Sequence, residues 1–321
     1  MTSHLKSQIT GVLVLGALFG LAACQDNVSP DTERAKPSLA QAGSRGHRAL
    51  LAINRALAAR DSKIRVPYID YVTNGASGQV GQRIFAFDRG NKQIGIDWVP
   101  GDPRRGGGTN ITYLVDRSDA SPDGLTASQV DAAIDRAMNT WEAIRCSKLS
   151  IDPVTDPGTD PDLFDGLVGF GGVGTPLADI THAGWYPAAF FELVFGPGSS
   201  EFVLAFTAPF IFVDDDGNPT DINNDRNLDY ALAEIYYNDG FAWGINTDFE
   251  PLIDVETVAL HESGHGLSQG HFGKIFQTVA NGKVHFAPFA IMNALLSRQA
   301  HELTGTDIGG HCSIWANWPH K

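Results

Sequence analysis

A short run of histidine and glutamate near the C-terminal end constrains this chain more than any other feature. His261 and His265 are four residues apart, a spacing that places both imidazoles on one face of an α-helix. His271 can reach the same point only if the helix ends and the chain turns back. Glu262 lies beside the first histidine. Three nitrogen ligands with an open fourth position are the arrangement of a catalytic zinc site, so we expect a helix, a reversal and an ion site here.

The residues before this run predict the start of that helix. Asp254 is a candidate N-cap, and Glu256 is favourable at the positive end of the helix dipole. Val255, Val258 and Ala259 recur at helical spacing, so one side of the helix can pack while the histidines face a groove. A structural cluster of histidines without a metal is the alternative.

The run from Val258 to His271 resembles the metzincin metalloproteases, and most closely the matrixins, whose pattern is H-E-x-x-H-x-x-G-x-x-H followed by a Met-turn. The Met-turn candidate is Met292, and residues 303–308 resemble the start of the helix that follows it. The resemblance implies an α+β zincin fold, with a mixed twisted sheet, long helices and an active-site helix. It also implies a zinc ion on His261, His265 and His271, with Glu262 as general base and Met292 as the apolar support beneath the ligands.

One residue departs from this pattern. Ser268 stands where the family usually has glycine, at a turn that favours positive φ. Gly266 and Gly270 flank it and are candidates to make the turn instead. If His271 fails to reach the ion, Glu302 is the alternative third ligand, because it is the only glutamate after Glu262.

The N-terminus predicts export. Lys6 precedes an apolar run of about thirteen residues, Gly11 to Ala23, a length typical of a signal peptide. Cys24 follows directly, and the junction resembles the lipobox of bacterial lipoproteins. We therefore expect a signal peptide over residues 1–23 and a lipidated Cys24 on a bacterial membrane, in the cell envelope with the outer membrane favoured, or an extracellular protein. An ordinary secretory signal is the alternative. Membrane contact would run through the lipid anchor only.

Charge and cysteine content narrow the class of partner. The formal net charge is −14, and without residues 1–23 it is about −15, which argues against nucleic acid as a partner. We expect a monomer that acts on a protein or peptide substrate. Cys146 and Cys312 remain after Cys24. In an oxidising compartment they could form one disulfide, and two buried free thiols are the alternative.

The segment before the predicted zinc domain divides into two parts. Residues 24–43 read as a flexible tether. Residues 44–106 predict a short helix over 47–60 and strands over 64–72, 82–87 and 92–99, which is a small β-rich region and a candidate inhibitory pro-segment. The cysteine switch of matrixins is absent, because no cysteine lies between Cys24 and Cys146. Arg104-Arg105, in a glycine-rich stretch, is a candidate processing site.

Residues 107–321 make up the predicted metalloprotease domain. Strands are expected over 110–115, 148–153, 178–185 and 202–213, and residues 228–237 fit either helix or strand. Thr126 opens a capping box, and a helix with clear 3.6-residue periodicity follows it to Ile144. The glycine run 169–174 matches G-x-G-x-x-G, but Pro176 follows where a helix should open, so we read it as a loop.

An acidic stretch supplies a second metal candidate. Its oxygen side chains alternate along the chain as in a calcium loop, although it is not an EF-hand, and a solvated acidic turn is the alternative. The candidate calcium ligands are Asp214, Asp216, Asn218, Asp221, Asn223, Asp225 and Asp229.

The sequence therefore predicts a zinc-dependent endopeptidase, with Zn²⁺ and a candidate Ca²⁺ as cofactors. Two other functions stay open. One is a non-catalytic, zinc-containing surface-binding lipoprotein, and the other is a zinc amidase that acts on cell-wall peptide.

Overall fold

The computed structural model describes residues 39–88, 90, 95–119, 121–249 and 251–320, and Lys36–Lys321 form one compact unit. The signal peptide, Cys24 and most of the predicted tether lie outside the described residues. Within the described ranges, no helix combines the length and the apolar character needed to cross a membrane.

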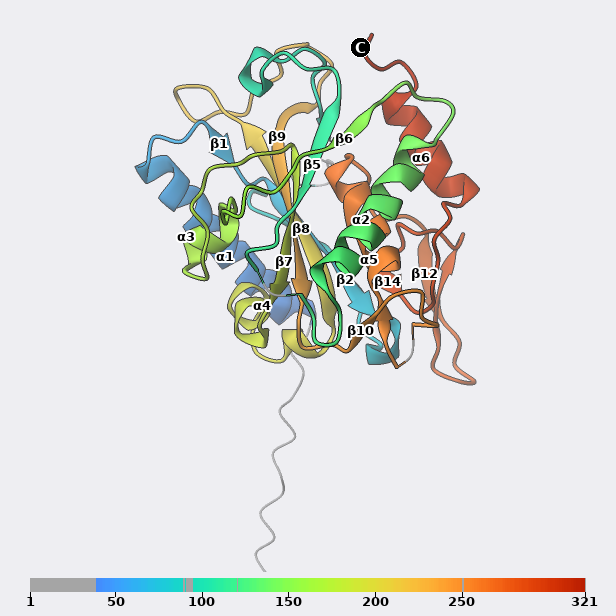
Figure 1. Ribbon diagram of the computed structural model, residues 1–321. Helices are drawn as coiled ribbons and strands as arrows, with labels where there is room; N and C mark the ends of the chain where they lie inside the picture. The colour runs from blue at the N-terminus through green and yellow to red at the C-terminus, as the bar shows by residue number, and fades with distance from the viewer. Residues whose placement is uncertain (1–38, 89, 91–94, 120, 250, 321) are drawn as a thin grey trace, which may run out of the picture. The chain divides into compact units, whose positions relative to one another are not determined.

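A mixed β-sheet runs through the middle of this unit (Figure 1). Its main strands are β14 Leu295–Leu296, β2 Tyr68–Asn74, β8 Val203–Phe212, β9 Leu228–Asn238, β7 Ile180–Tyr186, β5 Ile111–Val115 and β6 Ile151–Pro153, in that spatial order. β5, β6, β7 and β9 are parallel, and β8 is antiparallel to both β9 and β2. β14 is parallel to β2. The mixed sheet agrees with the predicted α+β class.

Several shorter strands complete the sheet or stand beside it. β1 Ile64–Arg65 pairs with β8, β3 Arg83–Phe85 with β2, and β4 Ile96–Asp97 with β9. Two separate ribbons join β10 Trp243–Gly244 to β11 Ile253–Asp254 and β12 Lys274–Gln277 to β13 Val284–Ala287.

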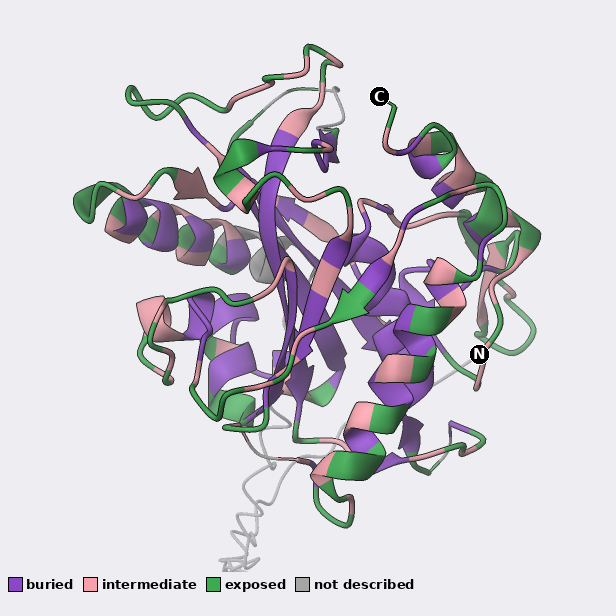
Figure 2. Cartoon of the chain, turned by 45° about the horizontal axis from the view of Figure 1, so that its top comes forward, coloured by how far each residue is buried: buried purple, intermediate pink, exposed green. Residues whose placement is uncertain are grey.

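Helices cover both faces of the sheet (Figure 1). α2 Ala127–Glu142 and α5 Val255–Gly266 pack together on one face, with α6 Gly305–Trp315 beyond them. α1 Leu39–Ala59, α3 Phe164–Val168 and α4 Ala188–Phe195 lie on the other face. A hydrophobic core lies on each face of the sheet, and strand β2 contributes to both. Its residues Tyr68 and Val72 pack into the core beneath α2 and α5, while Ile69 and Tyr71 pack into the core beneath α1 and α4. Figure 2 shows the central strands buried and the helices exposed on their outer sides.

Most of the predicted elements are confirmed, and the differences have physical causes. Residues 228–238 form a strand, which removes the helix alternative. α1 begins at Leu39, earlier than predicted, so it includes the last residues of the predicted tether. The helix continues through Gly46. A Cβ at Gly46 would lie 2.6 Å from Ile84, so this glycine lets α1 approach β3 closely. α3, α4 and the β12–β13 hairpin were not predicted.

The N-terminal region is not a separate β-rich unit. β2 lies inside the main sheet, between β14 and β8. The glycine-rich stretch that follows is not an open linker either. Arg104 pairs with Asp102 at 2.6 Å and with Asp229 at 2.8 Å. The side chain of Arg105 is 4% exposed and pairs with Asp179 at 2.8 Å. Both arginines are held in ion pairs, so Arg104-Arg105 is a poor site for proteolytic processing.

Cys146 and Cys312 form a disulfide, so the disulfide prediction is confirmed over free thiols. Their Cα atoms are 5.8 Å apart, across a sequence separation of 166 residues. The bond ties the segment after α2 to α6, which is the helix that follows the Met-turn candidate.

Replacing Cys146 and Cys312 together by serine should lower the free energy of unfolding by about 2–5 kcal/mol, because the unfolded chain regains the freedom of a long loop. Urea unfolding of both proteins, with and without reductant, measures this. Reductant should destabilise only the protein with cysteines. Equal stability of the two oxidised proteins would contradict the prediction.

Candidate metal centre

Helix α5 carries the first two histidines of the candidate metal centre and is buried along its whole length. Asp254 is its N-cap, as predicted, and its carboxylate accepts a hydrogen bond from the Thr257 N–H at 2.9 Å. A buried helix needs partners for its terminal carbonyls, because no water reaches them.

Three tryptophans supply hydrogen bonds to backbone carbonyls of this helix and its end. The indole N–H of Trp141, from α2, donates to Leu260 O at 2.8 Å. Trp98 donates to Gly266 O at 3.0 Å, and Trp315, from α6, donates to Leu267 O at 3.1 Å. Three distant parts of the chain therefore hold α5 and its C-terminal end in one position.

The reversal after α5 is made by Ser268 itself. This residue has φ +67°, and neither flanking glycine has a positive φ, so the expectation that Gly266 or Gly270 absorbs the turn is wrong. The Gln269 N–H donates to Gly264 O at 2.8 Å and closes the turn. His271 is thereby brought back to the face that His261 and His265 share.

The three histidines converge on one point. The Nε2 atoms of His261 and His265 are 3.2 Å apart, those of His265 and His271 are 3.2 Å apart, and those of His261 and His271 are 3.3 Å apart. Tetrahedral metal–nitrogen bonds of about 2.0–2.1 Å place the nitrogens roughly 3.3 Å apart. The histidines therefore fit a metal ion, and they form a group with metal-binding geometry.

Contacts behind the rings direct the Nε2 lone pairs toward that point. Nδ1 of His261 donates to Ile291 O at 2.7 Å, and Nδ1 of His265 donates to Gln269 O at 2.9 Å, which leaves each Nε2 free to bind a metal. Burial lowers the pKa of all three histidines, and their mutual proximity lowers the pKa of His261 and His271 further. Neutral imidazoles are the form that binds a metal.

Glu262 lies beside this point in a buried position. Its Oε2 accepts the hydroxyl proton of Thr207 on β8 at 2.6 Å. Its Oε1 is buried and has no hydrogen-bond partner in the part of the chain that the structure describes. Burial raises the pKa of this carboxyl well above its usual value, with a smaller contribution from Asp70. An unpartnered buried carboxylate oxygen is poised to accept a proton.

Met292 lies beneath the helix, where the sequence places the Met-turn. It is fully buried, and a Cβ at Gly264 would lie 2.3 Å from its sulfur, so only glycine fits at that point of α5. The Asp307 carboxylate of α6 accepts the N–H groups of Ile291 at 3.0 Å and Met292 at 3.1 Å. The turn at Met292 is therefore held between α5, through Gly264, and α6, through Asp307.

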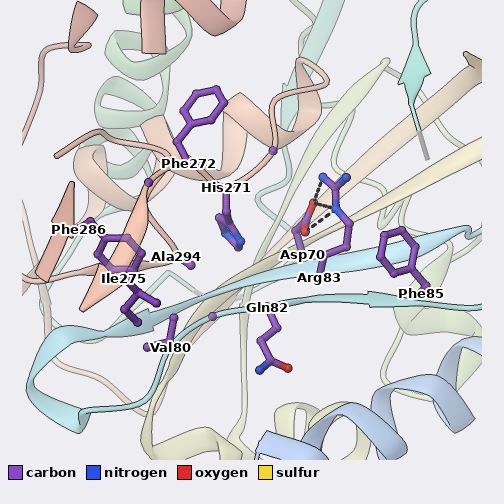
Figure 3. A pocket seen from close by; sticks show the side chains of 13 residues that line it. Asp70, Val80, Gln82, Arg83, Phe85, His271, Phe272, Ile275, Phe286 and Ala294 are labelled. Atoms are coloured by element: carbon purple, nitrogen blue, oxygen red, sulfur yellow. Dashed lines mark hydrogen bonds and ion pairs between the residues drawn. The ribbon is translucent and has the colours of Figure 1, made fainter. Parts of the chain in front are cut away.

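A pocket of about 460 Å³ opens beside His271. Figure 3 shows His271 on one side of it and the ion pair of Asp70 with Arg83 on the other. Arg83 Nη2 and Asp70 Oδ2 are 2.6 Å apart, and the same Asp70 oxygen lies 3.4 Å from Nδ1 of His265. The N-terminal strands β2 and β3 therefore form one wall of the candidate site.

The other predicted metal ligands are not part of the histidine group. Glu302 lines a separate pocket beside Cys146 and is not in the histidine group. In the acidic loop, Asp214 accepts the N–H groups of Asp216 and Asn218, and Asp229 pairs with Arg104. Asp221 accepts N–H groups of Asp225 and Arg226, so this loop partly satisfies its own carboxylates, and calcium there stays a prediction.

Four residues near the site were missed from the sequence: Asp70, Arg83, Thr207 and Asp307. Asp70 and Thr207 come from strands and carry no local signal, because only the sheet places them beside α5. Asp307 has a signal, since Thr304 and Asp307 form a capping box at the start of α6. That pattern predicts the helix start but not the contact with the Met-turn.

No protein-family model and no curated protein matches this chain.

Replacing Ser268 by glycine should stabilise the protein by about 0.5–1 kcal/mol. Relief of the left-handed backbone gains ~1–2 kcal/mol, and greater freedom of the unfolded chain costs ~0.4–1 kcal/mol. Ser263→Gly, inside α5, is the matched control and should destabilise by about 0.5–1 kcal/mol. Urea unfolding at constant metal content measures both, and equal destabilisation by the two changes would contradict this account of the turn.

Proposed function

We propose that this protein is a zinc-dependent endopeptidase of the metzincin type, similar to the matrixins. The observation that carries the proposal is a set of three convergent histidine nitrogens beside a buried glutamate that has one unpartnered oxygen. A structural zinc site is usually closed by four protein ligands, whereas three ligands leave room for water and substrate. A site that only binds would have no use for the glutamate.

Several features of the fold support the resemblance. The active-site helix follows a mixed sheet, the chain reverses to deliver His271, and Met292 packs under the helix before α6. Zinc at the histidines would polarise the scissile carbonyl and lower the pKa of water to about 7.

Glu262 would take the proton from the attacking water and later give it to the leaving amine. Thr207 occupies Oε2 and leaves Oε1 for the water. The chain thereby fixes which oxygen moves the proton.

Replacing Glu262 by glutamine should lower kcat roughly 10²–10⁴-fold on unfolded casein and leave zinc content unchanged. The amide keeps the size of the side chain but cannot accept the proton. Glu302→Gln is the matched control, since Glu302 lies away from the histidines, and it should keep full activity. Zinc is measured by mass spectrometry on the same samples. Full activity of Glu262→Gln would sink the mechanism.

The same assay separates the two rival functions. A zinc amidase would cleave cell-wall peptides and spare casein, and a binding protein would hold one equivalent of zinc and cleave neither. A chelator should abolish cleavage in the endopeptidase and the amidase alike.

Export to an oxidising compartment, with lipid attachment at Cys24, is part of the proposal. The disulfide between Cys146 and Cys312 supports export, because disulfides form and persist in oxidising compartments outside the cytoplasm.

We further propose that the candidate pro-segment, residues 44–106, keeps the site latent, and that its strand β2 is the part that blocks the site. Strand β2 pairs antiparallel with β8, and Asp70 lies opposite Thr207, the residue bonded to Glu262. An extended substrate commonly binds by adding a strand to a sheet edge, and here β2 holds that edge of β8. β2 pairs with β8 from Val203 to Thr207, and β1 pairs with Ile211 and Phe212, so both strands occupy this edge.

Cutting the chain after β3 tests this. A protease recognition sequence inserted between Asp88 and Gly95 allows the N-terminal segment to be cut from the rest. Cleavage followed by removal of the segment should raise casein hydrolysis at least about tenfold, equivalent to ~1.4 kcal/mol. The same insertion in the Glu262→Gln protein is the control. Unchanged or lost activity after removal would mean that the segment is a permanent part of the enzyme.

A further inference from the structure

A cluster of aspartates lies apart from the histidines. Asp116, Asp119, Asp160 and Asp162 each offer a carboxylate oxygen, and these oxygens all lie within 4.8 Å of one another. Asp116 and Asp119 follow β5, while Asp160 and Asp162 lie between β6 and α3. The fold thus gathers two loops that are about forty residues apart in the sequence.

The glycine run after α3 closes over this cluster. The Gly172 N–H donates to Asp160 Oδ2 at 2.6 Å, and the Gly174 N–H donates to Asp162 O at 3.1 Å. Gly172 has φ +74°, and a Cβ there would lie 2.3 Å from Asp162 O and 2.5 Å from the Asp165 carboxylate. Glycine is therefore required for the loop to pack against the carboxylates.

The cluster lacks the partners that its charge demands. Asp162 is fully buried, and its Oδ1 has no hydrogen-bond partner in the described residues. Asp116 Oδ2 and Asp160 Oδ1 are also buried and have no hydrogen-bond partner in the described residues. Tyr186 has one hydroxyl proton, yet its oxygen lies within hydrogen-bonding distance of three carboxylates, those of Asp119, Asp162 and Asp165.

Among the described residues, no basic side chain forms an ion pair with these four aspartates. Arg117, which follows Asp116 directly, pairs with Asp131 instead. Glu234 also lies close by and adds a further carboxylate. Unlike the four aspartates it is well satisfied, because it accepts the N–H groups of Leu163 and Phe164 and the hydroxyl of Tyr236. Buried carboxylates without partners are costly, so the cluster must either hold protons or bind a cation.

We propose that Asp116, Asp119, Asp160 and Asp162 bind one calcium ion, which fastens α3 and the glycine run to the end of the sheet. The ligand atoms are all carboxylate oxygens. Such a set favours a hard divalent cation, whereas zinc favours nitrogen and sulfur ligands. Calcium suits ligands from two loops better than magnesium, which demands a strict octahedron. This site is independent of the proposed peptidase activity.

Burial and mutual repulsion shift the pKa values of the carboxyl groups in and around the cluster. Burial, followed by repulsion from neighbouring carboxylates, raises the pKa of Asp162 well above its usual value. Burial is also the main cause that raises the pKa of Asp119 to about 7 and of Asp165 to about 6. Without a cation, the folded protein therefore holds protons that the unfolded chain has lost, and its stability falls as pH rises from about 4 to about 7. Bound calcium should remove this fall.

Calcium binding to the purified full mature chain tests the proposal, by calorimetry and by thermal unfolding at pH 7.5. Calcium at about 100 times Kd should raise Tm by roughly 5–10 °C. The double variant Asp160→Asn with Asp162→Asn should lose one equivalent of calcium and most of that shift. It should also be more stable than the unchanged protein in the absence of calcium, because two repelling charges are gone.

Asp61→Asn, at an exposed position outside both acidic regions, is the matched control and should leave calcium binding unchanged. Asp119→Asn is a second variant, at the less buried side of the cluster, and should weaken calcium binding at least tenfold. Zinc content and far-UV circular dichroism confirm that each variant is folded. Absence of calcium binding in the unchanged protein, or an unchanged equivalent in the folded double variant, would overturn the proposal.

Discussion

The complete burial of helix α5 is the constraint on which the rest of this structure depends. A helix that carries two histidines and a glutamate into the interior must have its polar groups satisfied by the protein, because water does not reach them. The indoles of Trp98, Trp141 and Trp315 meet that need from three remote segments. Thr207 hydrogen-bonds to one carboxylate oxygen of Glu262, and Ile291 O accepts the Nδ1–H of His261 on the side away from the candidate ion site. The same contacts that permit burial also set the geometry of the ligands.

The N-terminal strands change how this centre meets its surroundings. β2 contributes side chains to the hydrophobic cores on both faces of the sheet. It also brings Asp70 and Arg83 to the pocket beside His271. The strand therefore affects both packing and access to the site, and the predicted domain of residues 107–321 does not include it.

Two acidic regions illustrate why composition alone does not locate an ion. The stretch 214–229 has the more regular spacing, but its aspartates accept backbone N–H groups or pair with Arg104. The aspartates at 116–119 and 160–162 show no pattern along the chain, yet the fold brings them together with unpartnered oxygens. Spacing reports what one loop can do, whereas a site built from two loops depends on strand pairing.

Local patterns in the sequence determined a large part of this protein. Periodicity and capping located α2 and α5 and placed His261, Glu262 and His265 on one helix, because helix geometry is a property of neighbouring residues. Only the tertiary structure decided that Ser268 adopts a positive φ, that β2 covers the edge of β8, and that Asp70, Thr207 and Asp307 reach the site. These outcomes depend on contacts between segments far apart in the chain, and the energy of such contacts exceeds local preference without leaving a mark in the local sequence.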